Sequence, residues 1–169
     1  MLQNPGLQGT IPNLTAWAVV GDATIAIDGD TPLTSAIPST IRLDVSKDTT
    51  GAVGLTNEGY WGIPVDGSEF KSSFWIKGDY SGNITIRLVG NSSGTEYGST
   101  TFTHTSTADK FTEATAKFPT MKAPDGNVLY ELTVDGSVAA GSSLNFGYLT
   151  LFGETYKSRL VAPIPFEAA

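Results

Sequence analysis

Side chains that could carry out chemistry are few in this chain. Its 169 residues include no cysteine and one histidine, which excludes disulfides, thiolate nucleophiles, cysteine metal sites and sites with several histidines. That histidine, His104, lies in a polar stretch between Thr103 and Thr105, and no Gly-X-Ser-X-Gly nucleophile motif accompanies it. We therefore interpret His104 as a solvated loop residue rather than as a catalytic base.

Carboxylates are the other candidates for catalysis. Hydrolysis of a glycosidic bond needs two of them facing each other across a cleft. Most of the acids here lie in turn sequences such as Asp66-Gly67, Asp125-Gly126 and Asp135-Gly136, where bonding to the local backbone accounts for them. We therefore expect that the chain is not an enzyme.

The composition limits the partners. The formal net charge of −7 disfavours nucleic acid and anionic membrane surfaces, because both attract basic proteins. No apolar run approaches the ~20 residues of a membrane-spanning helix. Only 16% of the residues are charged, so neutral Ser, Thr, Asn and Gly must cover the surface, as is common in extracellular β proteins.

Three Asn-X-Ser/Thr sequons, at Asn13, Asn83 and Asn91, are candidate N-glycosylation sites and favour a secreted, extracellular protein. The first residues have neither the basic start nor the apolar region of a signal peptide. Either a signal has been removed or the protein stays inside the cell. A glycan needs open solvent, so an end of the fold that carries one is not the ligand site.

The elements that must position these residues are strands. Helical periodicity is nearly absent, and period-two alternation of apolar and polar residues recurs instead. Alternation of this kind predicts strands over residues 23–28, 41–45, 74–77, 83–89, 98–103, 114–118, 130–134 and 144–152. The last of these alternations is broken around Gly147, which indicates a β-bulge.

Turn sequences between the strands, with no repeat or linker, predict one all-β domain, an antiparallel β-sandwich or jelly roll. We assign residues 1–159 to this sandwich, with Trp17 in its core. Residues 160–169 are assigned to a proline-containing C-terminal extension, because Pro163 and Pro165 cannot donate in a central strand.

Alternation also predicts which side chains face solvent. If Phe74 and Ile76 point into the core, Trp75 points outward. One ring of the adjacent pair Tyr60 and Trp61 should face inward and the other outward. The same rule of alternation places three further side chains on outer faces of the sheets: Arg87, Tyr97 and Glu131.

Exposed aromatic and polar side chains suit a saccharide. Aromatic rings stack on the apolar face of a pyranose, and charged or amide groups bond its hydroxyls. The sequence thus predicts a carbohydrate-binding set: Tyr60, Trp61, Trp75, Arg87, Tyr97 and Glu131. The alternative for Trp75 is a ring covered by a neighbouring loop, because large aromatics are usually mostly buried.

Several short segments also carry a resemblance to a known family: residues 1–4, 7–9, 12–17, 20–24, 149–152 and 154–157, with Asn57-Glu58-Gly59-Tyr60-Trp61-Gly62-Ile63 and Ser73-Phe74-Trp75-Ile76-Lys77-Gly78. They resemble fungal α-L-arabinofuranosidases of glycoside hydrolase family 51, over about residues 1–159. The resemblance implies a β-sandwich similar to carbohydrate-binding modules of families 4 and 9. In those enzymes the catalytic barrel lies outside this stretch. After Arg159 the chain departs from the family pattern, so the resemblance implies no inherited activity.

The same resemblance bears on cofactors. Relatives among those modules hold a structural calcium with acids of the first-strand region and of the last strand. At the matching positions this chain has Gln8 and Gly147, and losing two carboxylates weakens an oxygen-ligand calcium site strongly. We expect no cofactor, with a structural calcium as the open alternative.

Together these observations predict a non-catalytic, lectin-like protein that binds a poly- or oligosaccharide of a plant or fungal cell wall. The rival hypothesis is a structural remnant of an arabinofuranosidase. Such a sandwich would bind no glycan itself and would pack on a partner or self-associate through a former contact surface. An enzyme is the third hypothesis, and we expect neither nucleic acid nor a membrane as a partner.

Overall fold

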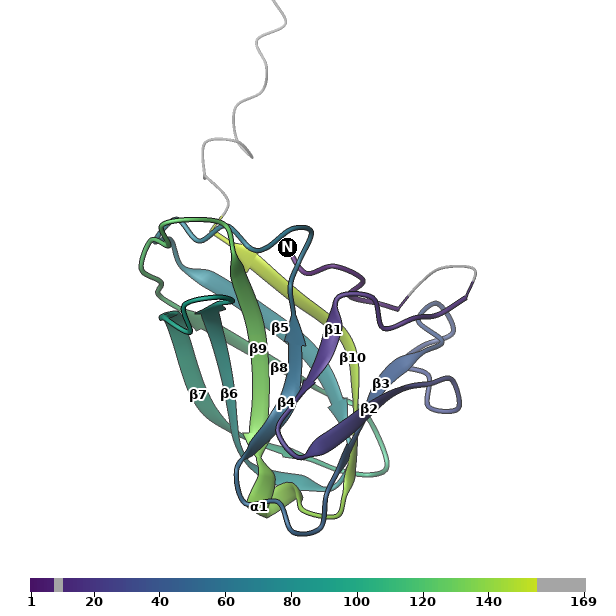
Figure 1. Cartoon of the computed structure of the whole chain (residues 1–169). Coiled ribbons are helices and arrows are strands. Elements are labelled where there is room, and N and C mark those ends of the chain that lie inside the picture. Colours follow the sequence, from purple (N-terminus) through teal and green to yellow (C-terminus); the bar gives the residue numbers. More distant parts are fainter. Residues whose placement is uncertain (8–10, 155–169) are drawn as a thin grey trace, which may run out of the picture.

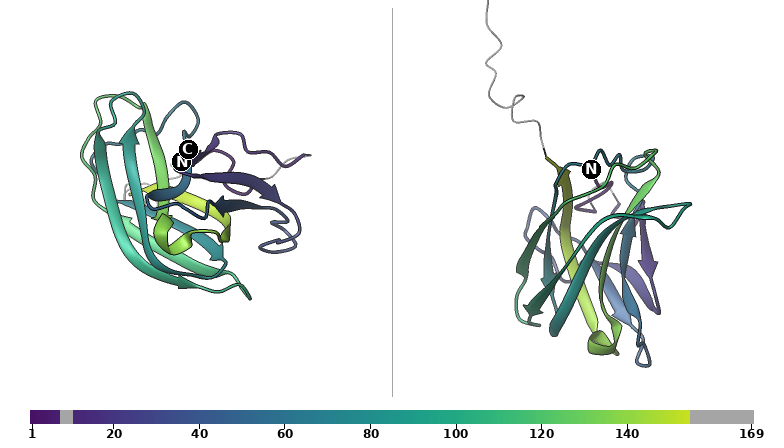
Figure 2. Two further views of the ribbon diagram at one scale, coloured as in Figure 1. Left: turned by 60° about the horizontal axis from the view of Figure 1, so that its bottom comes forward. Right: turned by 90° about the vertical axis from the view of Figure 1, so that its left-hand side faces the viewer.

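The computed structural model describes residues 1–7 and 11–154. These residues form two five-stranded antiparallel sheets that face each other (Figures 1 and 2). Sheet A contains, in spatial order, β1 (Trp17–Val20), β4 (Ala52–Asn57), β9 (Val128–Asp135), β6 (Tyr80–Gly90) and β7 (Glu96–Ser106). Sheet B contains β2 (Ala23–Asp28), β3 (Thr40–Val45), β10 (Ser143–Gly153), β5 (Phe70–Lys77) and β8 (Thr112–Phe118). The predicted antiparallel sandwich is confirmed, whereas the predicted boundary after residue 159 and the extension lie outside the described residues.

Alternation builds the core between the sheets. All eight predicted strands are present, and each lies within a strand of equal or greater length. In β6 the side chains of Ile84, Ile86 and Leu88 are fully buried, and in β5 those of Phe74 and Ile76 are. Burial of one such side chain stabilises the fold by roughly 1.5–3 kcal/mol, so the alternating residues fix which face of each strand points inward.

The sequence did not predict two strands of sheet A, β1 and β4. In β4 only Val53 and Leu55 point into the core as apolar side chains, too few for a clear alternation. Between them, a Cβ at Gly54 would lie 1.9 Å from the carbonyl oxygen of Leu132 on β9. A side chain at this position would collide with the backbone, so the close approach of β4 to β9 requires glycine.

A buried polar chain joins the two sheets. Tyr130 on β9 and Ser72 on β5 are both fully buried, and their hydroxyl oxygens lie 3.0 Å apart. The Ser72 hydroxyl donates to the carbonyl of Thr150 at 3.0 Å, so Tyr130 must be the donor to Ser72. Burial raises the pKa of the Tyr130 phenol.

The pairing of β10 changes along its length, toward one end of the sandwich. β10 pairs with β3 only from Ser143 to Phe146, and its register against β5 then shifts between Gly147 and Thr150. The predicted bulge is confirmed. Met1 and the far end of β10 lie together at this end, and the short helix α1 (Gly136–Ala139) lies at the opposite end (Figure 1). No helix among the described residues is long and apolar enough to cross a membrane.

Candidate functional site

The predicted carbohydrate-binding residues lie on three separate surfaces. Arg87 and Glu131 are on the outer face of sheet A, on β6 and β9. Trp75 is on the outer face of sheet B, on β5. Tyr60 and Trp61 are in the loop between β4 and β5. The structure therefore does not bring the predicted set together into one site.

Arg87 and Glu131 form an ion pair with each other. They are opposite residues in the register of β6 and β9, and Arg87 Nη2 and Nε lie 2.6 and 3.0 Å from Glu131 Oε1. A second carboxylate, Glu96, lies 3.7 Å from Arg87 Nη1. Their outward orientation is confirmed, but these groups satisfy one another within the sheet and have less to offer a ligand.

Tyr97 was predicted to face outward, and this is wrong. Leu88 pairs with Gly98, but the next residue of β6, Val89, pairs with Glu96, so Tyr97 is the extra residue of a register shift. The shift turns the Tyr97 ring toward the core, where it is 9% exposed. The ring cannot stack on a bound sugar.

Trp75 does point outward, opposite to the buried Phe74 and Ile76. Its side chain is nevertheless partly buried. The neighbouring position on β10 is Gly147, and Leu33, from the loop before β3, would lie 3.2 Å from a Cβ there. A loop thus covers the sheet beside Trp75, which fits the alternative of a partly covered ring.

The prediction that one ring of the Tyr60 and Trp61 pair faces inward is wrong. Tyr60 is 57% exposed and Trp61 is 99% exposed. Alternation holds only for extended backbone, and this loop turns through positive φ at three of four successive residues: +65° at Gly59, +70° at Trp61 and +92° at Gly62. Positive φ is unfavourable for a bulky side chain such as tryptophan, and strained backbone of this kind is concentrated at functional sites.

A cleft of about 450 Å³ lies at the same end of the sandwich. Its aromatic walls are Tyr60 and Tyr148, and Tyr148 belongs to the bulge of β10, where φ is +46° and the side chain is 44% exposed. The remaining lining is neutral and largely polar: Gln3, Asn4, Pro5, Gly6, Asn13 and Thr15. We call this the aromatic cleft.

Hydrogen bonds hold the N-terminal wall of the aromatic cleft in place. Gln3 and the buried Asn57 exchange two bonds, from Gln3 N to Asn57 Oδ1 at 3.0 Å and from Asn57 Nδ2 to the Gln3 carbonyl at 2.9 Å. Trp17, buried as predicted, donates from its indole to the carbonyl of Asn4 at 3.0 Å. Asn4 Nδ2 in turn donates to the carbonyl of Asn13 at 2.8 Å. These hydrogen bonds therefore tie the wall to the core and fix its geometry.

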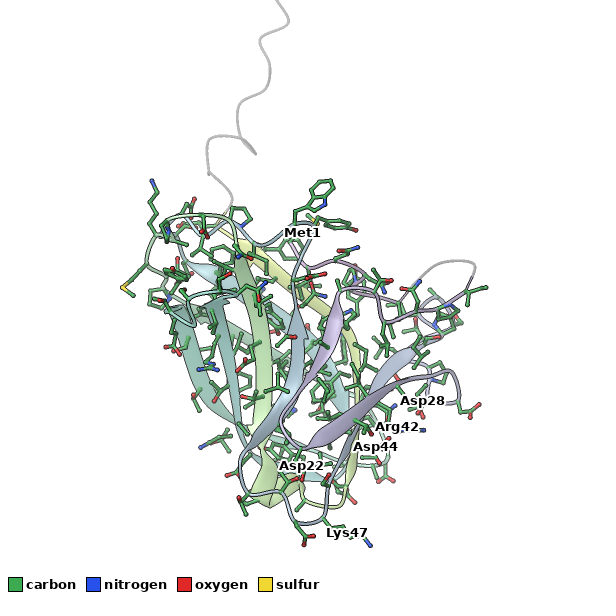
Figure 3. The ribbon with its side chains drawn as sticks, viewed as in Figure 1. Met1, Asp22, Asp28, Arg42, Asp44 and Lys47 are labelled. Atoms are coloured by element: carbon green, nitrogen blue, oxygen red, sulfur yellow. The ribbon has the colours of Figure 1, made fainter. Side chains whose placement is uncertain are left out.

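The sequence pattern does not single out the N-terminal amides or Tyr148 as site residues. The one available signal was the broken alternation at Gly147, which predicted the bulge but not that the next residue would turn its ring to the cleft. Met1, 69% exposed, also belongs to this end, since its carbonyl lies beside Gly59. Figure 3 shows Met1 at the opposite end of the sandwich from the charged residues Asp22 and Lys47.

His104 is not a loop residue, contrary to the prediction. It lies on β7, partly buried, and its Nε2 is 2.9 Å from the hydroxyl of Thr112 on β8. Burial lowers the pKa of the imidazole, because the charged form is poorly solvated there. The contact joins the open edges of the two sheets. Within residues 1–7 and 11–154 no group of three or more His, Cys, Asp or Glu could hold a metal ion.

One of the two residues matched to the calcium position, Gly147, lies in the described part of the chain. Gly147 offers no side-chain oxygen, and the nearest atoms to a Cβ there belong to the apolar Leu33. The second matching position, Gln8, lies outside the described residues. A calcium site needs several oxygen ligands, and Gly147 supplies no carboxylate for one.

Comparison with known proteins relates this chain to one region of larger enzymes. It is 87% identical over 159 residues to α-L-arabinofuranosidase A of Aspergillus niger, a match that covers 94% of this chain and 25% of that protein. The chain thus spans about a quarter of the length of the relatives that it matches, and the relatives' catalytic barrel is not covered. No protein-family model matches the chain.

Solved structures agree with this relationship. The arabinose-bound MgGH51 α-L-arabinofuranosidase superimposes with a TM-score of 0.85 at 33% identity, over 94% of this chain and 27% of that one. The CBM22-1 xylan-binding domain of Paenibacillus barcinonensis Xyn10C superimposes with a TM-score of 0.62 at 10% identity, over 89% of this chain and 92% of that domain. The second likeness shows the fold alone: a β-sandwich of the carbohydrate-binding-module type.

Proposed function

Since this chain is a close homologue of one region of fungal α-L-arabinofuranosidase A, we propose that it is a non-catalytic carbohydrate-binding module. Its ligand would be a poly- or oligosaccharide of a cell wall, bound in the aromatic cleft. The observation that carries this proposal is the exposure of Tyr60 and Tyr148, which line a cleft whose other walls are neutral and largely polar, with the exposed Trp61 next to Tyr60 in the same loop. The xylan-binding domain of similar fold supports it by analogy.

The chemistry of the cleft suits a sugar. Tyrosine and tryptophan rings stack on the C–H faces of sugar rings and lose few rotamers on binding. Amides donate and accept at once, so Gln3, Asn4 and Asn13 can bond hydroxyls that do the same. This arrangement provides binding without a nucleophile or an acid/base pair. We infer that hydrolysis in the relatives depends on the region that this chain does not cover, and that the module is secreted with its substrate outside the cell.

The direct test is a titration of arabinoxylan, linear xylan, arabinan and β-glucan, followed by calorimetry and by tryptophan fluorescence. Trp17 is buried and Trp75 partly buried, so a shift in emission would come mainly from the exposed Trp61. We expect Tyr60→Ala, which removes a ring that lines the cleft, to weaken binding by about tenfold, because an aromatic contact is worth ~0.5–1.5 kcal/mol beyond its buried area.

Phe152→Ala is the matched control for this titration. Phe152 is also an exposed aromatic, 50% exposed, but it lies on β10 opposite Lys71 and does not line the cleft. Its replacement should leave the affinity unchanged. Absence of heat and of a fluorescence change with every glycan would overturn the proposal, as would equal losses in the two variants.

One observation favours the alternative, a structural module that binds no glycan. Met1, Tyr60, Trp61 and Tyr148 are all exposed at the end where the chain's first residues and the end of β10 meet. Exposed apolar side chains gathered in this way can mark a protein interface. Light scattering at rising concentration tests it: self-association that Tyr60→Ala and Trp61→Ala abolish, together with no glycan binding by the native chain, would favour the structural role.

A further inference from the structure

The outer face of sheet A carries a hydroxyl-rich surface that the proposed carbohydrate site does not use. A groove of about 320 Å³ runs over β4, β9, β6 and β7 there. It is lined by threonine hydroxyls, one amide and one carboxylate, with small residues at its edge: Thr50, Gly51, Ala52, Asn83, Thr85, Thr101, Thr133, Val134 and Asp135. We call it the hydroxyl groove. It contains no aromatic ring.

Asn83 occupies the rim of the hydroxyl groove and begins a sequon, Asn83-Ile84-Thr85. Its side chain is exposed on the outer face of β6, opposite Thr103 of β7. Thr103 donates to Asn83 Oδ1 at 3.1 Å, which fixes the amide plane. Among the described residues, none accepts a hydrogen bond from Asn83 Nδ2, the atom to which an N-linked sugar attaches.

We propose that Asn83 carries an N-linked glycan whose first sugars lie in the hydroxyl groove. A glycan attached at its rim would find the hydroxyls of Thr50 and Thr133 and the carboxylate of Asp135 within the same groove. These groups complement the hydroxyl and acetamido groups of N-acetylglucosamine. The proposal rests on the proposed secretion and not on carbohydrate binding in the aromatic cleft.

The chemistry is a transfer from a lipid-linked oligosaccharide diphosphate in the secretory pathway. Asn83 Nδ2 forms a bond to the anomeric carbon of the first N-acetylglucosamine. The bond from that carbon to the diphosphate oxygen breaks, and the diphosphate leaves with the electron pair. Nδ2 gives up one of its two protons in the same exchange, so no oxidant or reductant is needed.

The other two sequons differ from Asn83 in their surroundings. Asn13 lines the aromatic cleft, and its Oδ1 accepts bonds from Thr15 N at 3.0 Å and Asn4 Nδ2 at 3.3 Å. A glycan there would fill the proposed ligand site. Asn91 lies in the turn between β6 and β7, exposed and away from the groove. Asn83 is thus the sequon at which a sugar would find both space and partners.

Occupancy is tested by secreting the chain from a yeast and removing its N-glycans with peptide-N-glycosidase in heavy-oxygen water. Mass spectrometry then finds a labelled aspartate wherever a glycan was attached. We expect the label at residue 83 of the wild type, its loss in Asn83→Gln, and its retention in Thr85→Ser, which keeps the sequon. An unmodified residue 83 in the wild type overturns the proposal, whatever the outcome of the glycan titrations.

Seating in the groove is tested by thermal unfolding before and after deglycosylation. We expect the Tm of Asn91→Gln, in which Asn83 remains occupied, to fall by about 2 °C on deglycosylation, as loss of a few weak contacts would cause in a domain of this size. Thr133→Val, which removes a groove hydroxyl and keeps the sequon, should reduce that fall while residue 83 stays fully modified. An occupied Asn83 with no change in Tm would show a glycan that extends into solvent, and would overturn the groove part of the proposal.

Discussion

His104 shows how a single side chain can couple the stability of this fold to pH. The unfolded chain binds a proton on this imidazole near pH 6.5, whereas burial gives the folded state a lower pKa. As the pH falls through 6.5, the unfolded state therefore gains the proton first and the free energy of unfolding decreases. The decrease stops once the pH is below the folded pKa, since both states are then protonated.

We expect this decrease in the free energy of unfolding at low pH to disappear when the imidazole is removed. Urea unfolding of the wild type and of His104→Gln, each at pH 8, 6.5 and 5, measures it, because the difference between the two curves isolates the only histidine. Carboxylates whose pKa is lowered, such as Asp28 and Asp135, act at more acidic pH and are common to both proteins. A wild-type curve parallel to that of the variant would contradict the assignment.

The buried hydrogen bond between Tyr130 and Ser72 gives a second prediction about single side chains. In Tyr130→Phe the Ser72 hydroxyl still donates to the carbonyl of Thr150. The free energy of unfolding should therefore fall by about 1 kcal/mol, the net contribution of one hydrogen bond. In Ser72→Ala the buried phenol of Tyr130 loses its acceptor, which should cost more, roughly 1–3 kcal/mol. Denaturant unfolding of both variants checks the order. A larger loss in Tyr130→Phe would show that the Tyr130 hydroxyl is not the donor.

At the scale of elements, alternation predicted the strands that carry large apolar side chains and failed where backbone geometry decides. β5 and β6 were identified because Phe74, Ile76, Ile84 and their neighbours alternate regularly. β4 was missed because it contains few apolar side chains and has Gly54 at its centre. Gly54 allows the backbones of β4 and β9 to approach closely, which a pattern of side chains cannot reveal.

The candidate site was only partly predictable for the same reason. Tyr60 and Trp61 were recognised as aromatic candidates, but their common exposure depends on a run of positive φ that no alternation describes. Tyr97 was placed on the wrong face because one extra residue in β7 reverses every inference from alternation beyond it. Tyr148 joins the N-terminal amides only through the path of β10, which is a tertiary property.

Gly54→Ala tests the account of β4. The added Cβ would overlap the Leu132 carbonyl, so β4 and β9 must separate, and we expect a loss of about 3 kcal/mol or more in the free energy of unfolding. Gly51→Ala is the matched control, because a Cβ at Gly51 meets no atom within 4 Å. Its effect should be small. Similar stabilities of the two variants in denaturant unfolding would refute the close-packing explanation.

At the scale of the whole molecule, the ends and the outer faces of the sandwich offer different surfaces to a ligand. The outer face of sheet B is partly covered by a loop, and that of sheet A carries an internal ion pair and the hydroxyl groove. The aromatic cleft combines exposed aromatic rings with space for a ligand, at the end where Met1 lies. A bulge and a strained loop, rather than a flat strand face, therefore provide the proposed site.

The net charge of −7 then determines which glycans this cleft should accept. None of the residues that line the cleft is charged, so affinity for a neutral glycan should come from stacking and hydrogen bonds and should change little with salt. An anionic polymer such as polygalacturonate would meet a repulsive field at low salt. We expect neutral arabinoxylan to be retained equally in affinity electrophoresis at low and high ionic strength, and polygalacturonate not to be retained at low salt. Tighter binding of polygalacturonate at low salt, or arabinoxylan binding that weakens steeply with salt, would mean that the ligand contacts a basic surface instead of the aromatic cleft.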